Sequence, residues 1–139
     1  MNRFLTLAVI FTLVLSGCKY EEGPLVSFRG KKDRVVNIWT FGQVFDDQGN
    51  DVTSNYTNWW VSLDENNGVH IHWFLGAIAQ DDFGTWEFAD RKKSIHLTYN
   101  NPLLETYFPK QFLIQKLKNQ QLKIKSNGNA IYDLSGTVQ

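Results

Sequence analysis

The sequence has a single cysteine, Cys18, among its 139 residues, so no disulfide can form within the chain. It also has no Gly-x-Ser-x-Gly nucleophile motif. The paired carboxylates Glu21-Glu22 and Asp81-Asp82 are sequence neighbours, and neighbouring side chains on a strand or turn diverge, whereas acid–base catalysis needs them to converge in a cleft. We therefore expect these carboxylates to belong to a tether and a turn, and we expect no enzyme.

An excess of charge of one sign is also missing, because 14 basic side chains balance 14 acidic ones. This balance argues against a nucleic-acid-binding surface. Of the three histidines, His70 and His72 lie two apart on an expected strand, a spacing that can chelate a metal. A metal site needs three or four converging ligands, and another strand is expected to separate His96 from this pair. We therefore expect an exposed polar face here, with neither a metal site nor a cofactor.

Long hydrophobic segments are confined to the N-terminus. One basic residue, Arg3, precedes an apolar run from Phe4 to Leu15, and the small residues Ser16 and Gly17 follow it. This arrangement is typical of a secretory signal peptide, and the run is shorter than the roughly 20 apolar residues that span a bilayer. We therefore interpret residues 1–17 as a signal peptide.

The end of this segment, Leu15-Ser16-Gly17-Cys18, resembles the lipobox of bacterial lipoproteins. The resemblance implies that Cys18 is acylated and becomes the first residue of the mature protein, which would also account for the unpaired thiol. Several acyl chains on one residue give stable anchoring, since each buried CH₂ contributes about 0.8 kcal/mol. The expected partner is therefore a membrane.

Residues 18–33 form the expected tether. Lys19 follows the cysteine where lipoproteins of the inner membrane often carry Asp, which implies anchoring in the outer membrane. Lys19 with Glu21 and Glu22 also resembles the surface-export signals of some outer-membrane lipoproteins. A short solvated tether explains the same residues, so periplasmic and surface orientations both stay open.

The rest of the chain consists of short runs rich in β-branched and aromatic residues, separated by Gly, Asn and Asp. Residues 30–34 are open to one helical turn, 53–57 form a linker, 80–82 form a turn, and 103–107 give no clear pattern. No amphipathic helix of useful length lies between strands, which argues against βαβ folds. Residues 34–139 therefore predict one all-β domain, an antiparallel meander that closes into a barrel or folds into a sandwich. The eight expected strands are 38–45, 59–63, 69–75, 84–88, 94–99, 111–117, 122–125 and 130–138.

Three patterns in order resemble the small lipocalin-like domains of bacterial lipoproteins. They are Val35 to Trp39, Gly84-Thr85-Trp86-Glu87-Phe88 followed by 95–97, and 112–117 followed by 122–124. The resemblance implies a closed barrel of about eight strands, whose mouth often holds a small apolar molecule in that family. Asn37 stands where lipocalins usually have Gly, and no Arg follows Arg91, although lipocalins carry one on their last strands. The resemblance therefore supports the fold more than ligand carriage.

Bulky aromatic residues have two possible roles in such a barrel. Trp59, Trp73, Trp86 and Phe88 either line a ligand pocket or fill the core. Trp59 and Trp60 are neighbours, so they face opposite sides of their strand, and we expect Trp60 to be the exposed one. An exposed Trp60 would stack on a sugar, touch lipid or dock a partner protein, unless a loop covers it.

Two functions remain open. The first is a membrane-anchored lipoprotein that binds a small apolar or amphipathic ligand without catalysis. The second is an accessory or structural lipoprotein with a filled barrel, which contacts a partner protein or a glycan through exposed aromatic residues. An open, apolar-lined cavity would favour the first.

Overall fold

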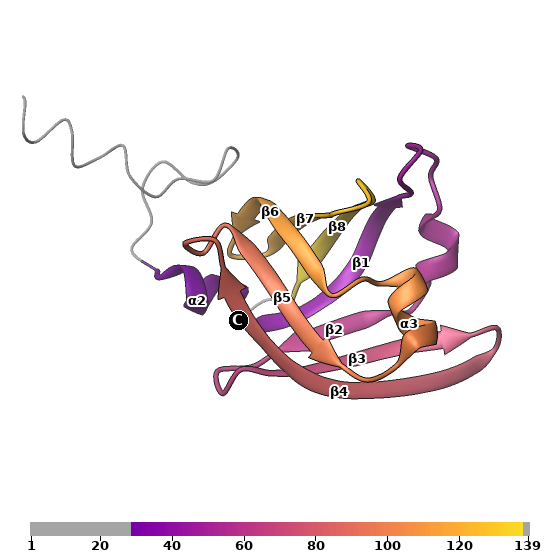
Figure 1. The fold of residues 1–139 in the computed structure, drawn as a ribbon, viewed down its shortest axis with the longest axis horizontal. Helices are drawn as coiled ribbons and strands as arrows, with labels where there is room; N and C mark the ends of the chain where they lie inside the picture. Colours follow the sequence, from indigo (N-terminus) through magenta and orange to yellow (C-terminus); the bar gives the residue numbers. More distant parts are fainter. Residues whose placement is uncertain (1–28, 138–139) are drawn as a thin grey trace, which may run out of the picture.

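A computed structural model describes residues 29–137, so the expected signal peptide, Cys18 and most of the expected tether lie outside the described residues. The described chain is an eight-stranded closed barrel in which each strand pairs with its sequence neighbours and β1 pairs with β8 (Figure 1). All pairs are antiparallel, which confirms the predicted meander and its closure. The strands are β1 (Asn37–Phe45), β2 (Trp60–Leu63), β3 (Gly68–Leu75), β4 (Ile78–Ala89), β5 (Ser94–Tyr99), β6 (Gln111–Lys118), β7 (Gln121–Ser126) and β8 (Ile131–Gly136).

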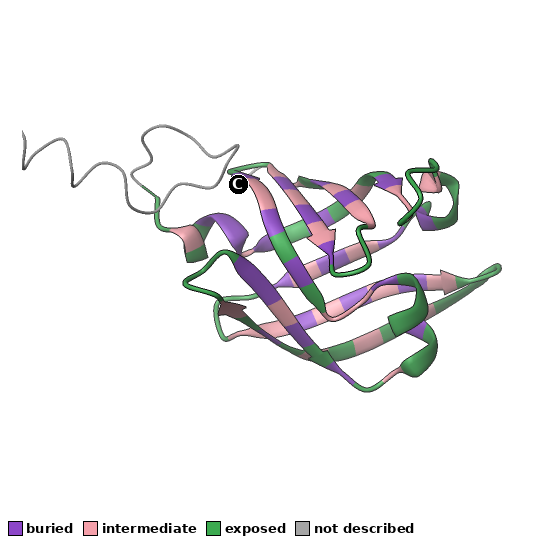
Figure 2. Ribbon diagram, turned by 45° about the horizontal axis from the view of Figure 1, so that its top comes forward, coloured by how far each residue is buried: buried purple, intermediate pink, exposed green. Residues whose placement is uncertain are grey.

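The two-residue alternation of the sequence sets the two faces of the barrel wall (Figure 2). In β3, Val69, Ile71 and Trp73 are buried, while His70 and His72 lie on the outer face. The interior is filled by large side chains that are no more than 2 % exposed. The largest are Trp39, Trp73, Trp86, Phe108 and Phe112.

The turn predicted at Gln80-Asp81-Asp82 is wrong. These residues lie within β4 and pair with β3, with Asp81 opposite His72. The chain instead reverses between Leu75 and Ile78, where Gly76 adopts a positive φ of 62° that suits glycine. Asp favours turns, so the local pattern predicts a turn here, but the two carboxylates point to opposite faces of a long strand.

Short helices cover both ends of the barrel. Helix α2 (Lys31–Val35) confirms the helical turn considered for residues 30–34 and lies at one end. A 3₁₀-helix, η1 (Thr53–Tyr56), replaces the expected linker, and α3 (Pro102–Tyr107) occupies the stretch that gave no clear pattern. Both lie at the opposite end, which we call the mouth. Asn101 begins α3, because its side chain accepts hydrogen bonds from the amides of Leu103 and Leu104.

Polar residues close the α2 end and account for the two departures from the lipocalin pattern. The Arg34 guanidinium is buried and donates to the carbonyl of Leu117 on β6. In this chain, therefore, an arginine before β1 contacts a late strand, where lipocalins have an arginine on the last strands themselves. Asn37 is also buried, and its side-chain oxygen accepts from the Thr137 hydroxyl at 2.7 Å. Asn37 thus joins the start of β1 to the chain that follows β8.

Candidate ligand site at the barrel mouth

A hollow of about 580 Å³ opens at the mouth, between η1, α3 and the end of the β3–β4 hairpin. Its apolar wall comes from Trp59, Phe74, Leu75 and Tyr107. The remaining lining comes from Gly76 of the β3–β4 turn and from polar residues in and after η1, namely Ser54, Asn55, Thr57 and Asn58. We call this space the mouth hollow; its volume lies in the range of small-molecule sites, while it is open to solvent and more polar than most of them.

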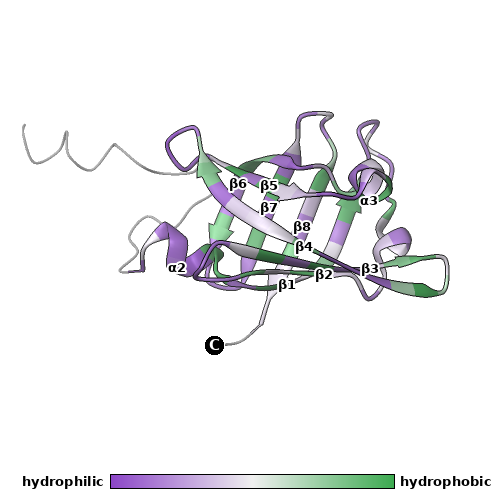
Figure 3. Ribbon diagram, turned by 60° about the horizontal axis from the view of Figure 1, so that its bottom comes forward, coloured by the Kyte–Doolittle hydropathy of each residue, from purple (hydrophilic) through white to green (hydrophobic). Residues whose placement is uncertain are grey.

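The β3–β4 hairpin forms one side of the mouth hollow because it extends beyond its neighbours. The last pairing between β2 and β3 joins Trp60 to His72, whereas β3 and β4 continue pairing as far as Leu75 and Ile78. The hairpin therefore projects past the barrel wall, and its tip is hydrophobic, unlike the other turns (Figure 3). Ile78 is 65 % exposed there.

Trp59, which lines the mouth hollow, carries an unused hydrogen-bond donor. The side chain is only 3 % exposed, and its buried Nε1 has no hydrogen-bond partner among the described residues. The other deeply buried indoles are all paired: Trp39 donates to Val35, Trp73 to Asp82 and Trp86 to Asp64. A buried unpaired N–H lowers the stability of the folded protein by roughly 1–3 kcal/mol. The unpaired N–H of Trp59 is therefore unusual and suggests a role for this residue at the hollow.

Helix α3 is held across the mouth by tyrosine hydroxyl groups from three elements. Tyr56 and Tyr132 donate to the carbonyl of Tyr107 at 2.6 and 2.9 Å, and Tyr99 donates to the carbonyl of Phe108. Burial raises the pKa of all three phenols above its ordinary value, so each stays a protonated donor near neutral pH. We call this set of three hydrogen-bonding tyrosines the tyrosine latch.

A second hollow, of about 310 Å³, lies on the other side of α3 and shares Tyr107 with the mouth hollow. Tyr56 and Tyr132 of the tyrosine latch also line it. Between the two hollows the mouth is filled by the side chain of Phe108, whose ring centroid lies 5.4 Å from that of Phe41 and 4.7 Å from that of Phe112. The space at the mouth is thus divided by α3 and Phe108.

The four aromatic residues predicted to line a pocket do not meet at one site. Trp59 lines the mouth hollow, and Trp73 packs behind it with ring centroids 5.6 Å apart. Trp86 and Phe88 contact each other at 5.3 Å toward the α2 end, where the Lys32 ammonium lies 5.9 Å from the Trp86 ring. Sequence reasoning missed Phe74 and Tyr107, because neither a projecting hairpin nor a short helix across the mouth has a periodic signal.

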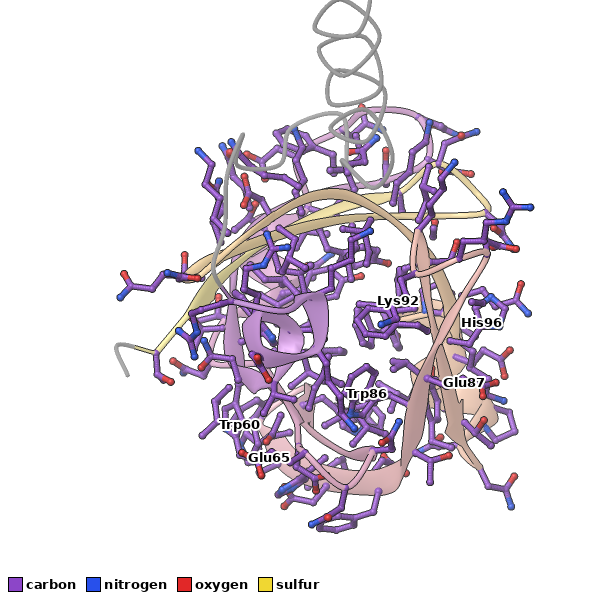
Figure 4. All side chains as sticks on the ribbon, turned by 90° about the vertical axis from the view of Figure 1, so that its left-hand side faces the viewer. Trp60, Glu65, Trp86, Glu87, Lys92 and His96 are labelled. Carbon is purple, nitrogen blue, oxygen red and sulfur yellow. The ribbon has the colours of Figure 1, made fainter. Side chains whose placement is uncertain are left out.

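Trp60 lies on the outer face, opposite in direction to Trp59, and is half-buried among aromatic neighbours. Its indole lies 4.6 Å from the His70 ring and 5.3 Å from the His72 ring, and His70 stacks on Phe83 at 4.2 Å. We call these rings, with Phe74 beside His72, the outer aromatic row. Figure 4 shows Trp60 outside the wall and Trp86 inside it.

One carboxylate fixes both histidines of the outer aromatic row. Asp81 Oδ1 lies 2.7 Å from His70 Nε2 and 2.9 Å from His72 Nδ1. A carboxylate only accepts, so these two ring nitrogens carry the protons. Hydrogen bonds from His72 and then His70 lower the pKa of Asp81. Among residues 29–137, no cluster of three His, Cys, Asp or Glu side chains is arranged to hold a metal ion.

Comparisons with solved structures identify the fold. A lipocalin-like protein from Bacteroides uniformis superposes with a TM-score of 0.59 at 13% identity, over 78% of this chain and 100% of that chain. An uncharacterized protein from Bacteroides eggerthii gives 0.57 at 12% identity, over 74% of this chain and 99% of that one. A protein from Burkholderia xenovorans gives 0.52 at 9% identity, over 88% and 99%. No protein-family model and no curated protein matches the sequence.

The described residues thus form a lipocalin-like barrel, as the three sequence patterns predicted. Identities this low establish the fold and leave the function to the site. Within residues 29–137, no helix has both the length and the apolar character needed to cross a membrane.

Proposed function

We propose that this protein is a non-catalytic, extracytoplasmic lipoprotein that is anchored through Cys18 and binds a small amphipathic ligand in the mouth hollow. The observation that carries the proposal is that Trp59, which lines that hollow, keeps its indole N–H buried and unpaired. On ligand entry the indole would turn to bring this N–H to the hollow, where a ligand oxygen accepting from it would remove the cost of leaving it unpaired.

The lining specifies the chemistry of the ligand. Phe74, Leu75 and Tyr107 offer an apolar surface to a hydrocarbon or ring, while Asn55 and Asn58 offer polar atoms at the rim. Trp59 Nε1 is a donor only, so the buried end of the ligand carries an acceptor such as a carbonyl, ether or carboxylate oxygen. Because the barrel interior is filled, the proposed ligand would lie at the mouth, above the core formed by Trp73 and Phe108.

The anchor and its membrane rest on the sequence. The lipobox-like residues 15–18 and the lysine after Cys18 support acylation and retention in the outer membrane, with a periplasmic or surface orientation. Mass spectrometry of the membrane-extracted protein tests this part directly. We expect an acylated N-terminal peptide beginning at Cys18, and an unmodified Cys18 would refute the anchor without touching the binding site.

Native mass spectrometry tests the binding site. We expect the chain from residue 19 onward, purified gently from its host's periplasm, to carry an adduct of defined mass. Trp59→Phe keeps an aromatic ring and removes the N–H, so it should weaken binding about tenfold, the effect of losing one buried hydrogen bond. Trp60→Phe, on the outer face, is the matched control. A bare mass that also fails to bind fatty acids and other apolar probes would contradict the proposal, as would equal losses in both variants.

A second candidate function has its own observation, the outer aromatic row. Trp60, Phe83 and the Asp81-bridged histidines form a partly exposed surface of rings and polar atoms, and Phe83 is 67 % exposed. Such a surface suits a glycan, because rings stack on sugar faces while carboxylate and imidazole groups bond to hydroxyls. Screening for glycans whose binding is lost in Trp60→Ala and kept in Trp59→Phe would favour this candidate over the mouth hollow.

A further inference from the structure

The two ends of the barrel differ in charge. Because the strands run up and down in order, the β2–β3, β4–β5 and β6–β7 turns lie at the same end as α2 (Figure 1). We call this the basic end; its cations are Lys31, Lys32, Arg91, Lys92, Lys93 and Lys118. The mouth instead carries Asp46, Asp47, Asp51 and Glu105, and Lys110 there is paired with Glu105 at 2.8 Å.

The acidic residues of the basic end are exposed, and two of them accept hydrogen bonds within their own turns. Asp64 accepts hydrogen bonds from the backbone amides of Asn66 and Gly68, and Asp90 accepts from the Ser94 hydroxyl at 2.8 Å. Asp33 and Glu65 stay near Lys32 in a shallow hollow of about 470 Å³. Glu87, near the end of β4, is a fifth carboxylate there, so the six cations leave this end slightly positive.

The β4–β5 turn presents three consecutive cations, Arg91, Lys92 and Lys93, all exposed. The turn holds Asp90, Arg91 and Lys92 at positive φ angles of 52°, 56° and 64°. Left-handed backbone costs a non-glycine residue roughly 1–2 kcal/mol. Glycine at these positions would relieve the strain. The charged residues there therefore lower the stability of the fold, and a role other than folding explains their presence.

The expected anchor reaches the molecule at this same end. The described chain begins at Arg29, beside α2, and ten residues separate it from Cys18 in the sequence. That length spans at most about 40 Å when fully extended. An acylated Cys18 would therefore tether the barrel to the lipid surface by its basic end.

We propose that the basic end rests on anionic phospholipid headgroups, which orients the mouth hollow away from the membrane. The proposal uses the anchor of the proposed function but not its ligand, so it survives if the mouth hollow is empty. One lipid attachment and a basic patch reinforce each other, because the anchor supplies proximity and the cations supply electrostatic attraction. The outward-facing mouth is then free to exchange ligand with the aqueous side.

Vesicle flotation tests the proposal with the unacylated chain from residue 19, since the barrel closes on itself within residues 29–137. We expect binding to vesicles of phosphatidylglycerol mixed with phosphatidylcholine, loss of that binding at high salt, and none to phosphatidylcholine alone. Replacing Arg91, Lys92 and Lys93 together by Gln should weaken partitioning about a hundredfold.

The control is Lys123→Gln with Lys125→Gln, which removes two cations from the barrel wall along β7 and none of the six cations that define the basic end. It should retain most of the binding. Binding that ignores lipid charge, or that falls as far in the β7 variant as in the turn variant, would overturn the proposal. Circular dichroism of each variant confirms that the barrel is intact before binding is compared.

Discussion

The hydroxyl of Tyr132 donates a hydrogen bond of 2.9 Å to the backbone carbonyl of Tyr107, 25 residues earlier in the chain. Tyr56 donates to the same oxygen from η1, so one carbonyl at the end of α3 joins two distant parts of the barrel. A six-residue helix is not stable on its own, so the hydrogen bonds from the buried phenols hold α3 in position across the mouth.

Removing the two phenols that share this carbonyl should loosen α3. We expect Tyr56→Phe with Tyr132→Phe to lower the free energy of unfolding by about 2 kcal/mol, roughly 1 kcal/mol for each hydrogen bond. Hydrogen exchange should accelerate at the Phe108 amide, which donates to Leu104 at the end of α3. Tyr107→Phe keeps the accepting carbonyl and is the control. Unchanged exchange at Phe108 in the double variant would show that packing alone holds the helix.

The two faces of the wall should respond differently to loss of a tryptophan. Trp39 is fully buried and its Nε1 donates to Val35, whereas Trp60 is half-buried on the outer face. Trp39→Ala should cost about 3–5 kcal/mol, and Trp60→Ala no more than about 1 kcal/mol. Urea denaturation of both variants checks this. Similar losses would mean that the outer aromatic row belongs to the folding core.

Gly84 is required by the close approach of β4 and β5. A Cβ added there would lie 1.8 Å from the carbonyl oxygen of Thr98, and backbone cannot move aside cheaply. We expect Gly84→Ala to destabilise the barrel by about 3 kcal/mol or more, at the upper end of overpacking costs. Gly128→Ala is the control, because its nearest neighbour is the Ser126 hydroxyl at 3.8 Å. Thermal unfolding that gives equal midpoints for the two variants would contradict this account.

Asp81 should make stability depend on pH in the acid range. Hydrogen bonds from His72 and His70 lower its pKa in the folded state, so the folded protein binds this proton less readily than the unfolded chain. The resulting stability is present above the unfolded pKa of about 4 and is lost as the pH falls through the lower folded value. Asp81→Asn should therefore reduce the difference in melting temperature between neutral and acid pH. Asp47→Asn, at an exposed carboxyl, is the control. If both variants reduce the difference in melting temperature equally, the hydrogen bonds to Asp81 are not the cause.

Much of the fold was predictable from local patterns. β5 occupies the predicted residues, β1, β2, β3, β6 and β7 differ by one residue at one or both ends, and His70 and His72 face outward as expected. The errors arose where a tertiary contact overrides a local preference. Asp81 and Asp82 were assigned to a turn, but His72 pairs with one and Trp73 donates to the other. Helix α3 was not recognised, because six residues carry too little periodicity to stand out.

The sequence alone determined the meander, because alternation of apolar and polar residues with polar turns between strands specifies which face each side chain takes. It also determined that Trp59 and Trp60 oppose each other across one strand. Only the tertiary structure decided that the interior is filled, that α3 lies across the mouth and that Trp59 is left with an unpaired N–H beside a hollow. These features depend on distances between residues far apart in the chain, such as Tyr132 and Tyr107, and no local pattern encodes such distances.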